Sequence, residues 1–376
     1  MAYTDIDDPS AFFQATLYTG NGSHPRNITN DGNSDLKPDF LWLKKRNQAG
    51  TDHVLANSSI GWDAPKGNGY PWENGPFGGQ MSTSSTGAES TPAATYGYVS
   101  AALTDGFTAA AGGTNGDTVN QNGKTFVAWQ WKANGGTTAN NTTGSIDSVV
   151  QANTDAGFSI VTYTGTGGNI TVGHGLGVAP NAIIIKSRSN AAPWVVWTSG
   201  MAGTTSVMEL NATGAEQTVS NYWYNGFSST TFGLGTGTYS HNTNNYTYVA
   251  YCFAEKQGYS KFGKYVGNGN ADGPFVYTGF KPAFVMTKRT DSTSGWFIQD
   301  IKRGIRNSSS GTALEANTNL AESGIGATNY DIDFLSNGFK LRQSNAYLNA
   351  SGGSYIYMAF AENPFTTSTG IPTTAR

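Results

Sequence analysis

The 376-residue sequence predicts a mainly β fold made of three tandem, related β-sandwich repeats with very little helix. Only 12% of the residues are charged and 49 are glycine. Ser, Thr and Asn separate aromatic and β-branched runs, a composition that favours short strands and turns. A proline-led apolar phrase also recurs, as DLKPDFLWLKKR (35–46), GVAPNAIIIKSR (177–188) and GFKPAFVMTKR (279–289). Recurrence of this kind indicates a duplicated unit.

Other landmarks keep one order through the three repeats. Each repeat begins with a tyrosine and a glycine-rich turn, in YTGNG, YTGTG and YVGNG. The residue 14 positions after each proline opens a second apolar strand: Asp52, Trp194 and Trp296. An Ala-Glu pair follows, ending at Glu89, Glu216 and Glu322. The closing apolar strands align on Ala128, Ala250 and Ala359. The shared order indicates a triplication.

The proline-led phrase predicts a strand inside a sheet. Proline lacks the N–H that a ladder needs, so it suits the start of a strand, and the continuous apolar runs suit burial on both faces. The lysines that end these runs are expected to mark the return to solvent: Lys44, Lys186 and Lys288. The second apolar strand predicts a hairpin, with core tryptophans at Trp194, Trp197 and Trp296. A D-G or N-G pair predicts a positive-φ turn before Phe107, Phe227 and Phe339.

These landmarks predict the domain organisation of the chain. The first repeat covers 1–134 and contains an insertion at 62–80, and a Gly, Thr and Asn-rich linker follows at 135–156. The second repeat covers 157–257, the third covers 258–365, and a tail covers 366–376. Because the second repeat passes into the third without a linker, these two are expected to pack together.

Composition excludes several classes of protein. The 22 Lys and Arg against 25 Asp and Glu give a net charge of −3, which provides no basic footprint for nucleic acid. Cys252 is the only cysteine, so no intrachain disulfide is possible, and its apolar neighbours place it in the core. No apolar run reaches the roughly 18 to 20 residues of a membrane span, and the N-terminus lacks the features of a signal peptide. We expect a soluble protein made in a cytoplasm, without membrane insertion.

Candidate catalytic and metal-binding groups are few. The glycine phrases GTGGNI and GNGNADG lack the G-K-S/T and the following helix of a phosphate-binding loop. One glutamate recurs per repeat, whereas glycoside hydrolysis needs two carboxyls, so these residues are expected to be ion-paired or turn-capping. The histidines lack metal-ligand spacing and are expected at the surface or in turns: His24, His53, His174 and His241. We predict no catalytic residue, no cofactor and no metal, with calcium at DIDD (5–8) or DID (331–333) left open.

An insertion distinguishes the first repeat. A glycine follows the second apolar strand in each repeat, at Gly61, Gly200 and Gly304. From this glycine to the shared glutamate the first repeat needs 28 residues, against 16 and 18 in the others. The surplus, WDAPKGNGYPWENGPFGGQ (62–80), combines aromatic rings with carboxylates and an amide. Such groups suit a sugar, aromatic rings also anchor protein interfaces, and the rings could instead cover the end of the sandwich. The candidate binding residues are Trp62, Asp63, Tyr70, Trp72, Glu73 and Asn74.

Four stretches of the chain resemble a known family. IDDPSAFFQATLYTGNGS, DLKPDFLWLKKR, LTDGF with NGKTFVAWQWKANGG, and GFSIVTYTGTGGNITVGHGLGVAPNAIIIK are similar to repeat proteins of marine bacteriophages of the cyanophage and pelagiphage type. The resemblance covers nearly the whole chain. It implies concanavalin- or jelly-roll-like sandwiches, a virion structural or tail-fibre-like role and no catalytic motif. The chain departs from a long fibre because it lacks a coiled-coil or triple-β-helix shaft.

The sequence therefore predicts a non-enzymatic phage virion protein, made in the host bacterial cytoplasm. It leaves open a tail fibre or adhesin and a capsid decoration or head fibre. The expected partners are other virion proteins and a host-surface glycan or receptor, in a homo-oligomer with a trimer favoured by analogy. Two alternatives remain. A depolymerase of envelope glycan would need two close carboxylates in a groove, and a secreted carbohydrate-binding module would need a signal peptide.

Overall fold

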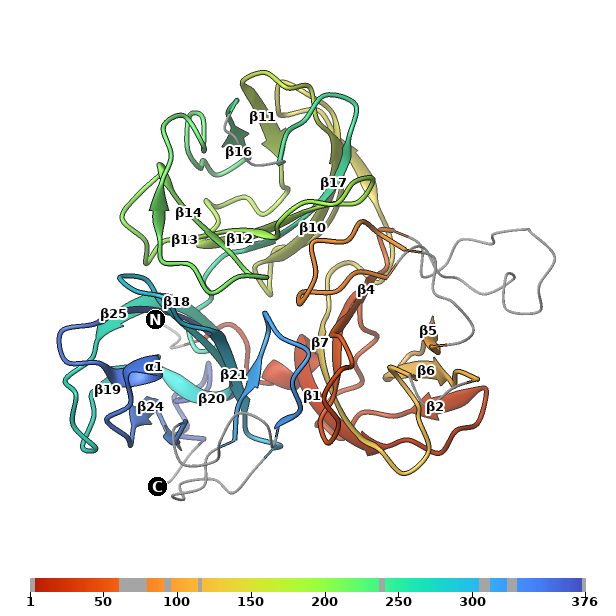
Figure 1. The fold of residues 1–376 in the computed structure, drawn as a ribbon, viewed down its shortest axis with the longest axis vertical. Coiled ribbons are helices and arrows are strands. Elements are labelled where there is room, and N and C mark those ends of the chain that lie inside the picture. Colours follow the sequence, from red (N-terminus) through yellow and green to blue (C-terminus); the bar gives the residue numbers. More distant parts are fainter. Residues whose placement is uncertain are drawn as a thin grey trace.

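The computed structural model describes residues 4–60, 80–90, 96–113, 117–236, 241–303, 312–322 and 330–373. Their regular secondary structure is antiparallel strand, apart from the 3-10 helix η1 (Pro9–Ala11) and the one-turn helix α1 (Ala346–Asn349). The prediction of a mainly β protein with very little helix is confirmed for this part of the chain. Figure 1 shows three groups of strands around a common centre, which we call the first, second and third units.

The first unit has two antiparallel sheets. The larger has the order β1–β7–β3–β4, with β1 (Phe13–Thr19), β7 (Thr125–Trp131), β3 (Phe40–Lys45) and β4 (Val54–Asn57). The smaller has the order β2–β6–β5, with β2 (Arg26–Ile28), β6 (Phe107–Ala110) and β5 (Tyr98–Ala102).

The second unit has an eight-stranded sheet and a two-stranded sheet. From one edge to the other, the larger contains β15 (Gln217–Thr218), β14 (Ser206–Glu209), β13 (Val195–Thr198), β12 (Ala182–Ser187), β17 (Thr247–Phe253), β10 (Phe158–Thr164), β9 (Ser148–Asn153) and β8 (Ala139–Asn141). The smaller pairs β11 (Ile170–Gly173) with β16 (Thr231–Leu234).

The third unit has a five-stranded and a three-stranded sheet. In order, the larger contains β18 (Ser260–Val266), β25 (Ser354–Pro364), β20 (Phe280–Arg289), β21 (Trp296–Asp300) and β22 (Leu314–Glu315). The smaller contains β19 (Phe275–Tyr277), β24 (Gly338–Leu341) and β23 (Ile332–Leu335).

The larger sheets share one strand order. In each, the unit's closing strand (β7, β17, β25) lies between the strand that carries the repeated tyrosine (β1, β10, β18) and the strand of the proline-led phrase (β3, β12, β20). The hairpin partner (β4, β13, β21) pairs on the other side. The predicted position of the proline-led strand inside the sheet is confirmed. Every residue of β3 and β12 is buried, as are most of β20.

The pairing register corrects two sequence alignments. Val127 and Val249 pair with the lysines that end their proline-led strands, and in the third unit Ile356 takes that place. Ala128 and Ala250 therefore correspond to Tyr357 and not to Ala359. On the hairpin partner, Val54 corresponds to Val195 and Phe297. The residue equivalent to Trp194 and Trp296 is consequently His53 and not Asp52, because the first unit has one more residue in this hairpin.

Two details of the third unit differ from the prediction. Pro38 and Pro180 stand before their strands, but Pro282 lies within β20 at an irregularity in its pairing with β25. Gly106 and Gly226 have the predicted positive φ, of 91° and 64°. Gly338 instead lies in β24, where a Cβ atom would come within 2.2 Å of the Val276 carbonyl oxygen. Close approach of two strands explains this glycine.

The segment 135–156, predicted as a linker, contains strands β8 and β9. β9 pairs with β10 over six residues and so extends the sheet of the second unit. Gln151 in β9 is fully buried; its Oε1 accepts from Gly136 N at 2.8 Å, and its Nε2 donates to Ser58 Oγ at 2.9 Å in the first unit. The segment expected to be a linker is thus an ordered part of the second unit's sheet, and through Gln151 it also contacts the first unit.

The larger sheet of the first unit is covered on both faces. Leu41 and Leu43 belong to a cluster that packs this sheet on the smaller one through Phe107. On the other face, Trp42 and Trp131 belong to a cluster that includes residues of the second and third units. The proline-led strand is therefore buried by its own small sheet on one side and by the neighbouring units on the other.

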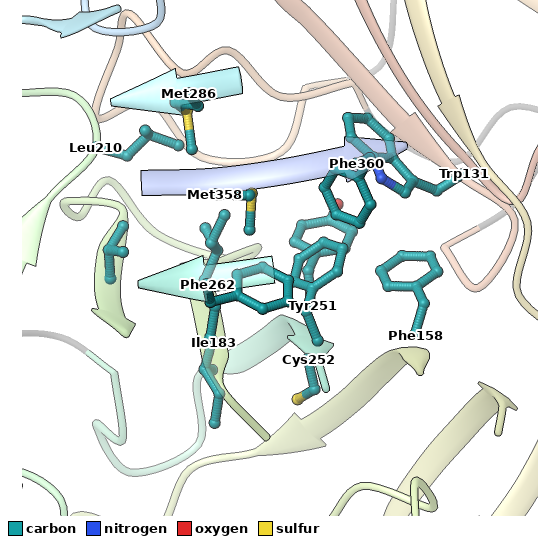
Figure 2. Packing of buried hydrophobic residues seen from close by; sticks show 14 of the residues in the cluster. Trp131, Phe158, Ile183, Leu210, Tyr251, Cys252, Phe262, Met286, Met358 and Phe360 are labelled. Atoms are coloured by element: carbon teal, nitrogen blue, oxygen red, sulfur yellow. The ribbon is translucent and has the colours of Figure 1, made fainter. Parts of the chain in front are cut away.

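Aromatic side chains of all three units meet at the centre (Figure 2). Phe360 of the third unit lies 5.5 Å from Trp131 of the first and 5.8 Å from Phe253 of the second, measured between ring centroids. Phe40 stacks on Tyr251 at 4.3 Å. Such pairs contribute about 0.5–1.5 kcal/mol each beyond the area that they bury. The three units thus share one core.

The repeated Tyr-x-Gly phrase fixes an equivalent loop in each unit. The tyrosine hydroxyl donates to a backbone carbonyl of that loop from Tyr18, Tyr163 and Tyr265. The glycine two positions later lies so close to the same loop that a Cβ atom would come within 2.0–2.4 Å of a carbonyl oxygen, at Gly20, Gly165 and Gly267. The phrase recurs because no side chain fits between these two backbones.

Candidate functional site

The residues predicted to bind a ligand or partner lie outside the described residues. They all fall within 61–79: Trp62, Asp63, Tyr70, Trp72, Glu73 and Asn74. Their role stays a prediction. The described part of the chain offers two other features with chemical content, namely the polar junctions between the units and a cavity in the first unit.

Three buried lysines link the units. Each Nζ donates to a backbone oxygen of a neighbouring unit: Lys44 to Asn319 (3.4 Å), Lys186 to Thr86 (3.2 Å) and Lys288 to Thr213 (3.3 Å). All three lysines have no exposed surface, and desolvation lowers the pKa of each to about 8. The prediction that they return to solvent is wrong, because a loop of the neighbouring unit covers the end of each strand.

A second hydrogen bond crosses each junction, to a residue four positions before the one that the lysine contacts. Trp194 Nε1 donates to Ser82 O at 2.8 Å, and Trp296 Nε1 donates to Glu209 O at 2.9 Å. His53 takes the equivalent place in the first unit, with its Nε2 3.0 Å from Glu315 O. The expected core role of these tryptophans is confirmed, since both are buried.

The tautomer of His53 follows from its neighbours. Trp42 Nε1 donates to His53 Nδ1 at 2.8 Å, so Nε2 carries the proton and donates to the third unit. Desolvation, with the charge of Lys44 as a second cause, holds the pKa of His53 well below its ordinary value. His53 is therefore a neutral structural donor that replaces an indole.

These contacts run in one direction around the molecule. The second unit donates to the first, the third to the second, and the first to the third. The lysine contacts follow the same cycle. A chain of three tandem units has therefore closed into a ring with approximate three-fold repetition of its junctions.

Two of the recurring glutamates form ion pairs across junctions. Glu89 Oε2 lies 2.5 Å from Arg188 Nε, and Glu322 Oε2 lies 2.7 Å from Arg46 Nε. Each glutamate also donates its backbone N–H to the carbonyl of the same arginine. The expected ion-paired state is confirmed for both. Each of these arginines follows its proline by eight residues, a spacing that could have marked it in the sequence.

The third glutamate keeps only part of this arrangement. Glu216 N donates to Thr290 O at 2.8 Å, which repeats the backbone contact. Thr290 stands where the other junctions have arginine, and Glu216 Oε1 accepts from Ala202 N at 2.8 Å instead. The backbone geometry is thus common to all three junctions, and the ion pair is not.

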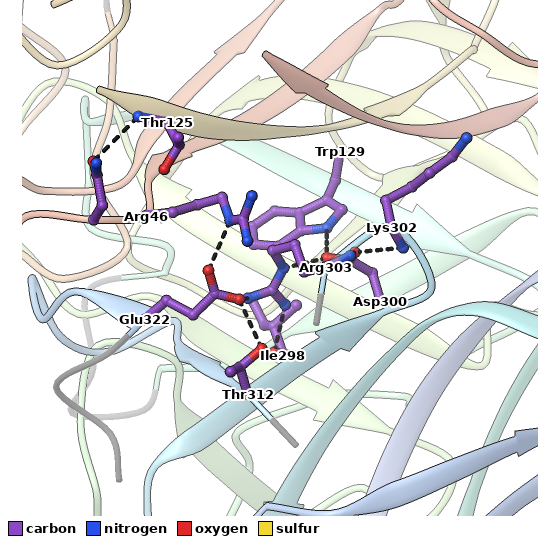
Figure 3. Close-up of polar contacts among 10 residues, drawn as sticks. Arg46, Thr125, Trp129, Ile298, Asp300, Lys302, Arg303, Thr312 and Glu322 are labelled. Atoms are coloured by element: carbon purple, nitrogen blue, oxygen red, sulfur yellow. Dashed lines mark hydrogen bonds and ion pairs between the residues drawn. The ribbon is translucent and has the colours of Figure 1, made fainter. Parts of the chain in front are cut away.

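The junction between the third and first units contains a buried ionic network (Figure 3). Arg303, only 5% exposed, has its Nε 2.5 Å from Asp300 Oδ2 and its Nη1 3.3 Å from Glu322 Oε1. Trp129 Nε1 donates to the same Asp300 oxygen at 2.8 Å, and its ring lies 5.3 Å from the guanidinium. With Arg46 included, two cations balance two anions, which is the condition for tolerating buried charge. No spacing along the sequence indicates this network, because it joins residues of two units.

A cavity of about 460 Å³ opens in the first unit, within the range of small-ligand pockets. Its walls are the hairpin residues 50–54, the loop 80–90, and Tyr96, Gly97 and Thr118. The loop starts at Gln80, the last residue of the insertion predicted to bind a ligand or partner. Tyr96 is 54% exposed, whereas Gln80 is buried.

Other candidate groups are structural where the structure describes them. Three histidines predicted at the surface or in turns are buried, at His53, His174 and His241, and Cys252 is buried as predicted. Within the described ranges, no three His, Cys, Asp or Glu side chains are grouped to hold a metal ion. No helix among the same residues is long and apolar enough to cross a membrane.

Comparison with known proteins identifies the family. The chain belongs to the family described as a domain of unknown function, DUF7483, whose model matches residues 8–364. No curated protein and no solved structure matches the chain.

Proposed function

We propose that this DUF7483 protein is a non-enzymatic structural protein of a bacteriophage virion, either a tail fibre or adhesin or a capsid decoration or head fibre. The observation that carries the proposal is the closed ring. The charged residues that recur in the sequence hold units together, as Glu89 and Arg188 do. Such an arrangement is typical of a rigid scaffold that leaves its loops and outer edges for contacts.

The repeat architecture supports the same proposal. We propose that each unit is a jelly-roll-like β-sandwich, on the basis of the paired larger and smaller sheets and the sequence resemblance to phage repeat proteins. Fold resemblance alone does not assign function. Loops at the sandwich ends would meet other virion proteins or a host-surface glycan or receptor, with weak contacts adding through many copies.

The assembled form is part of the proposal. The protein would be made in the host bacterial cytoplasm and incorporated into the virion as a homo-oligomer, with a trimer favoured. Multi-angle light scattering of the purified chain tests this directly. A mass of three chains supports the trimer. A mass of one chain contradicts it and leaves the ring within a single chain as the only three-fold arrangement of the protein in solution.

The glutamates do not favour the depolymerase alternative. Glu89 and Glu322 each hold an arginine of a neighbouring unit, so neither carboxylate is placed as a general acid over a substrate. The exposed tyrosine at the cavity of the first unit favours saccharide binding without hydrolysis.

Mass spectrometry of purified virions, followed by cryo-electron microscopy, tests the proposed function. We expect the protein in intact particles, at a position on the tail or capsid where its density shows three lobes. Its absence from particles that contain the other structural proteins would refute the proposal. Trp62→Ala with Trp72→Ala is expected to weaken adsorption or assembly while leaving the thermal unfolding of the chain unchanged.

A further inference from the structure

We propose that the cavity of the first unit is a binding site for a neutral saccharide. This inference rests on the proposed attachment function and names the class of ligand. The cavity combines an exposed aromatic ring, an exposed carboxylate and a buried amide within one space of about 460 Å³. Saccharide sites use these three kinds of group for the C–H face, the hydroxyl groups and the ring oxygen of a sugar.

Tyr96 supplies the aromatic surface. Its side chain is 54% exposed, yet its backbone is firmly held, because its carbonyl accepts from Thr118 N at 2.7 Å and from Thr118 Oγ1 at 3.0 Å. The next residue, Gly97, has φ +71° and packs so closely on Asp117 that a Cβ atom would lie 2.5 Å from its Oδ1. The ring is therefore carried on a fixed support, which lowers the entropy lost when a ligand stacks on it.

Asp52 and Gln80 supply the polar groups. Asp52 is exposed, and its Oδ1 accepts from Ser84 Oγ at 2.9 Å, which orients the carboxylate. Gln80 is buried, and its Nε2 has no hydrogen-bond partner among the described residues. Gln80 thus adds a buried polar residue to the wall of the cavity. A pair of sugar hydroxyls could donate to the carboxylate of Asp52.

The charge of the cavity favours an uncharged ligand. Of the described residues that line it, Asp52 is the one that carries charge at neutral pH, since His53 is held neutral by burial. A carboxylate in the cavity repels an acidic sugar and accepts hydrogen bonds from a neutral one. The proposed ligand is therefore a neutral mono- or oligosaccharide and not a uronic or sialic acid.

The cavity lies where the first repeat departs from the others. His53 lines it, and an indole stands at the same register position in the second and third units, at Trp194 and Trp296. The loop 80–90 begins at Gln80, the last residue of the insertion that distinguishes the first repeat. Sequence divergence and the cavity thus coincide, as expected for a binding function that only one copy of a repeat has acquired.

Saturation-transfer NMR and titration calorimetry on the full chain test the inference. The neutral probes are lactose, maltose and N,N′-diacetylchitobiose, and the acidic comparison is digalacturonate. We expect at least one neutral probe to bind. Tyr96→Ala should weaken that binding about tenfold or more, as for a central aromatic contact, and Asp52→Asn should weaken it severalfold. Both side chains are exposed, so thermal unfolding of these variants should match the unmodified chain.

Tyr277→Ala is the matched control. Tyr277 is 55% exposed and belongs to the third unit, so its removal should leave the affinity unchanged. The inference is overturned if no neutral probe binds, if Tyr96→Ala retains full affinity, or if digalacturonate binds as well as the neutral probes. Its failure differs from failure of the proposed function: a protein present in virions that binds none of the neutral probes refutes the saccharide site alone.

Discussion

The junction between the third and first units is ionic, whereas the junction between the second and third is mainly apolar. At the first of these, Arg303 and Asp300 form a buried pair that extends to Glu322. At the junction between the second and third units, Met286 and Met358 line a void of only about 10 Å³ together with Ile184 and Val196 of the second unit. Both junctions nevertheless keep the same backbone contact and the same buried lysine.

Chain connectivity explains the difference. β17 ends at Phe253 and β18 begins at Ser260, so a short connection holds the second and third units together at a high effective concentration. The third and first units lie at opposite ends of the chain, and closing a long loop carries a larger entropic cost. The contact that closes the ring carries the buried pairs of Arg303 in addition to an arginine–glutamate pair of the kind that also joins the first and second units.

The largest expected effect is at the centre of the closing junction. Arg303→Ala leaves Asp300 buried without its cation, which should lower the free energy of unfolding by about 3–5 kcal/mol. Denaturant unfolding measures the change. Lys302→Ala is the matched control, because Lys302 pairs with an exposed Asp31 and its loss should cost less than about 1 kcal/mol. Equal effects of the two substitutions would contradict the network's role.

The three recurring glutamates should rank by the pairing that each makes. Glu322→Gln weakens contacts with two arginines and should destabilise by about 2–3 kcal/mol, whereas Glu89→Gln weakens one and should cost about 1 kcal/mol. Glu216→Gln should be nearly neutral because Thr290 offers no cation. Thermal unfolding of the three variants gives the order of destabilisation. A large effect of Glu216→Gln would contradict the prediction that the ion pair sets the contribution of each glutamate.

The buried lysines test what the junctions share. The pKa of Lys186 is lowered to about 8 in the folded protein, whereas the unfolded chain has its ordinary value near 10.5. Between these values the unfolded state binds more protons, so the free energy of unfolding should rise with pH from about 8 to 10. Above about pH 10 stability should fall, because burial raises the pKa of Tyr163 and Tyr265 and only the unfolded tyrosines then ionise.

Lys186→Met isolates this effect. Between pH 8 and pH 10, the free energy of unfolding of the variant should rise by about 1–2 kcal/mol less than that of the unmodified chain, since each unit of pKa shift corresponds to about 1.36 kcal/mol. Urea unfolding at several pH values measures the slope. Lys256→Met, at a partly exposed lysine, is the control and should leave the slope unchanged. An identical slope in Lys186→Met and in the unmodified chain would refute a lowered pKa.

The smallest expected effect restores the missing arginine. Thr290→Arg places a guanidinium opposite Glu216, as at the other two junctions, and should raise the free energy of unfolding by about 0.2–1 kcal/mol. The gain should be smaller at high salt, since a partly exposed ion pair is screened. Thr290→Gln, which has similar length and no charge, is the control. Destabilisation by the arginine would show that the equivalence of the junctions does not extend to the side chains.

Much of the fold could be predicted from the sequence. The repeated tyrosine, the proline-led apolar run and the closing strand each correspond to a strand of the larger sheet, because backbone pairing imposes the same pattern on every copy. Alignment by counting failed where the copies differ in length, at His53 and Tyr357. Hydrogen-bond register, and not residue spacing, decides which residues are equivalent.

The sites were harder to predict. The residues singled out in 62–80 lie outside the described residues, and the cavity next to them depends on Tyr96 and Asp52, which no repeated pattern marks. The ionic network joins Asp300 and Arg303 to residues of the first unit. These residues are far apart in the sequence, so no local pattern indicates that they meet.

The sequence by itself predicted three related β units and the strands that have two buried faces, because apolar periodicity and turn residues act locally. Only the tertiary structure decided what buries those faces. Lys44 is the clearest case: a cation that ends an apolar strand indicates solvent, yet its Nζ meets a carbonyl 275 residues away in the chain. Burial of a charged group depends on which surfaces meet, and contact between distant segments is a property of the closed ring.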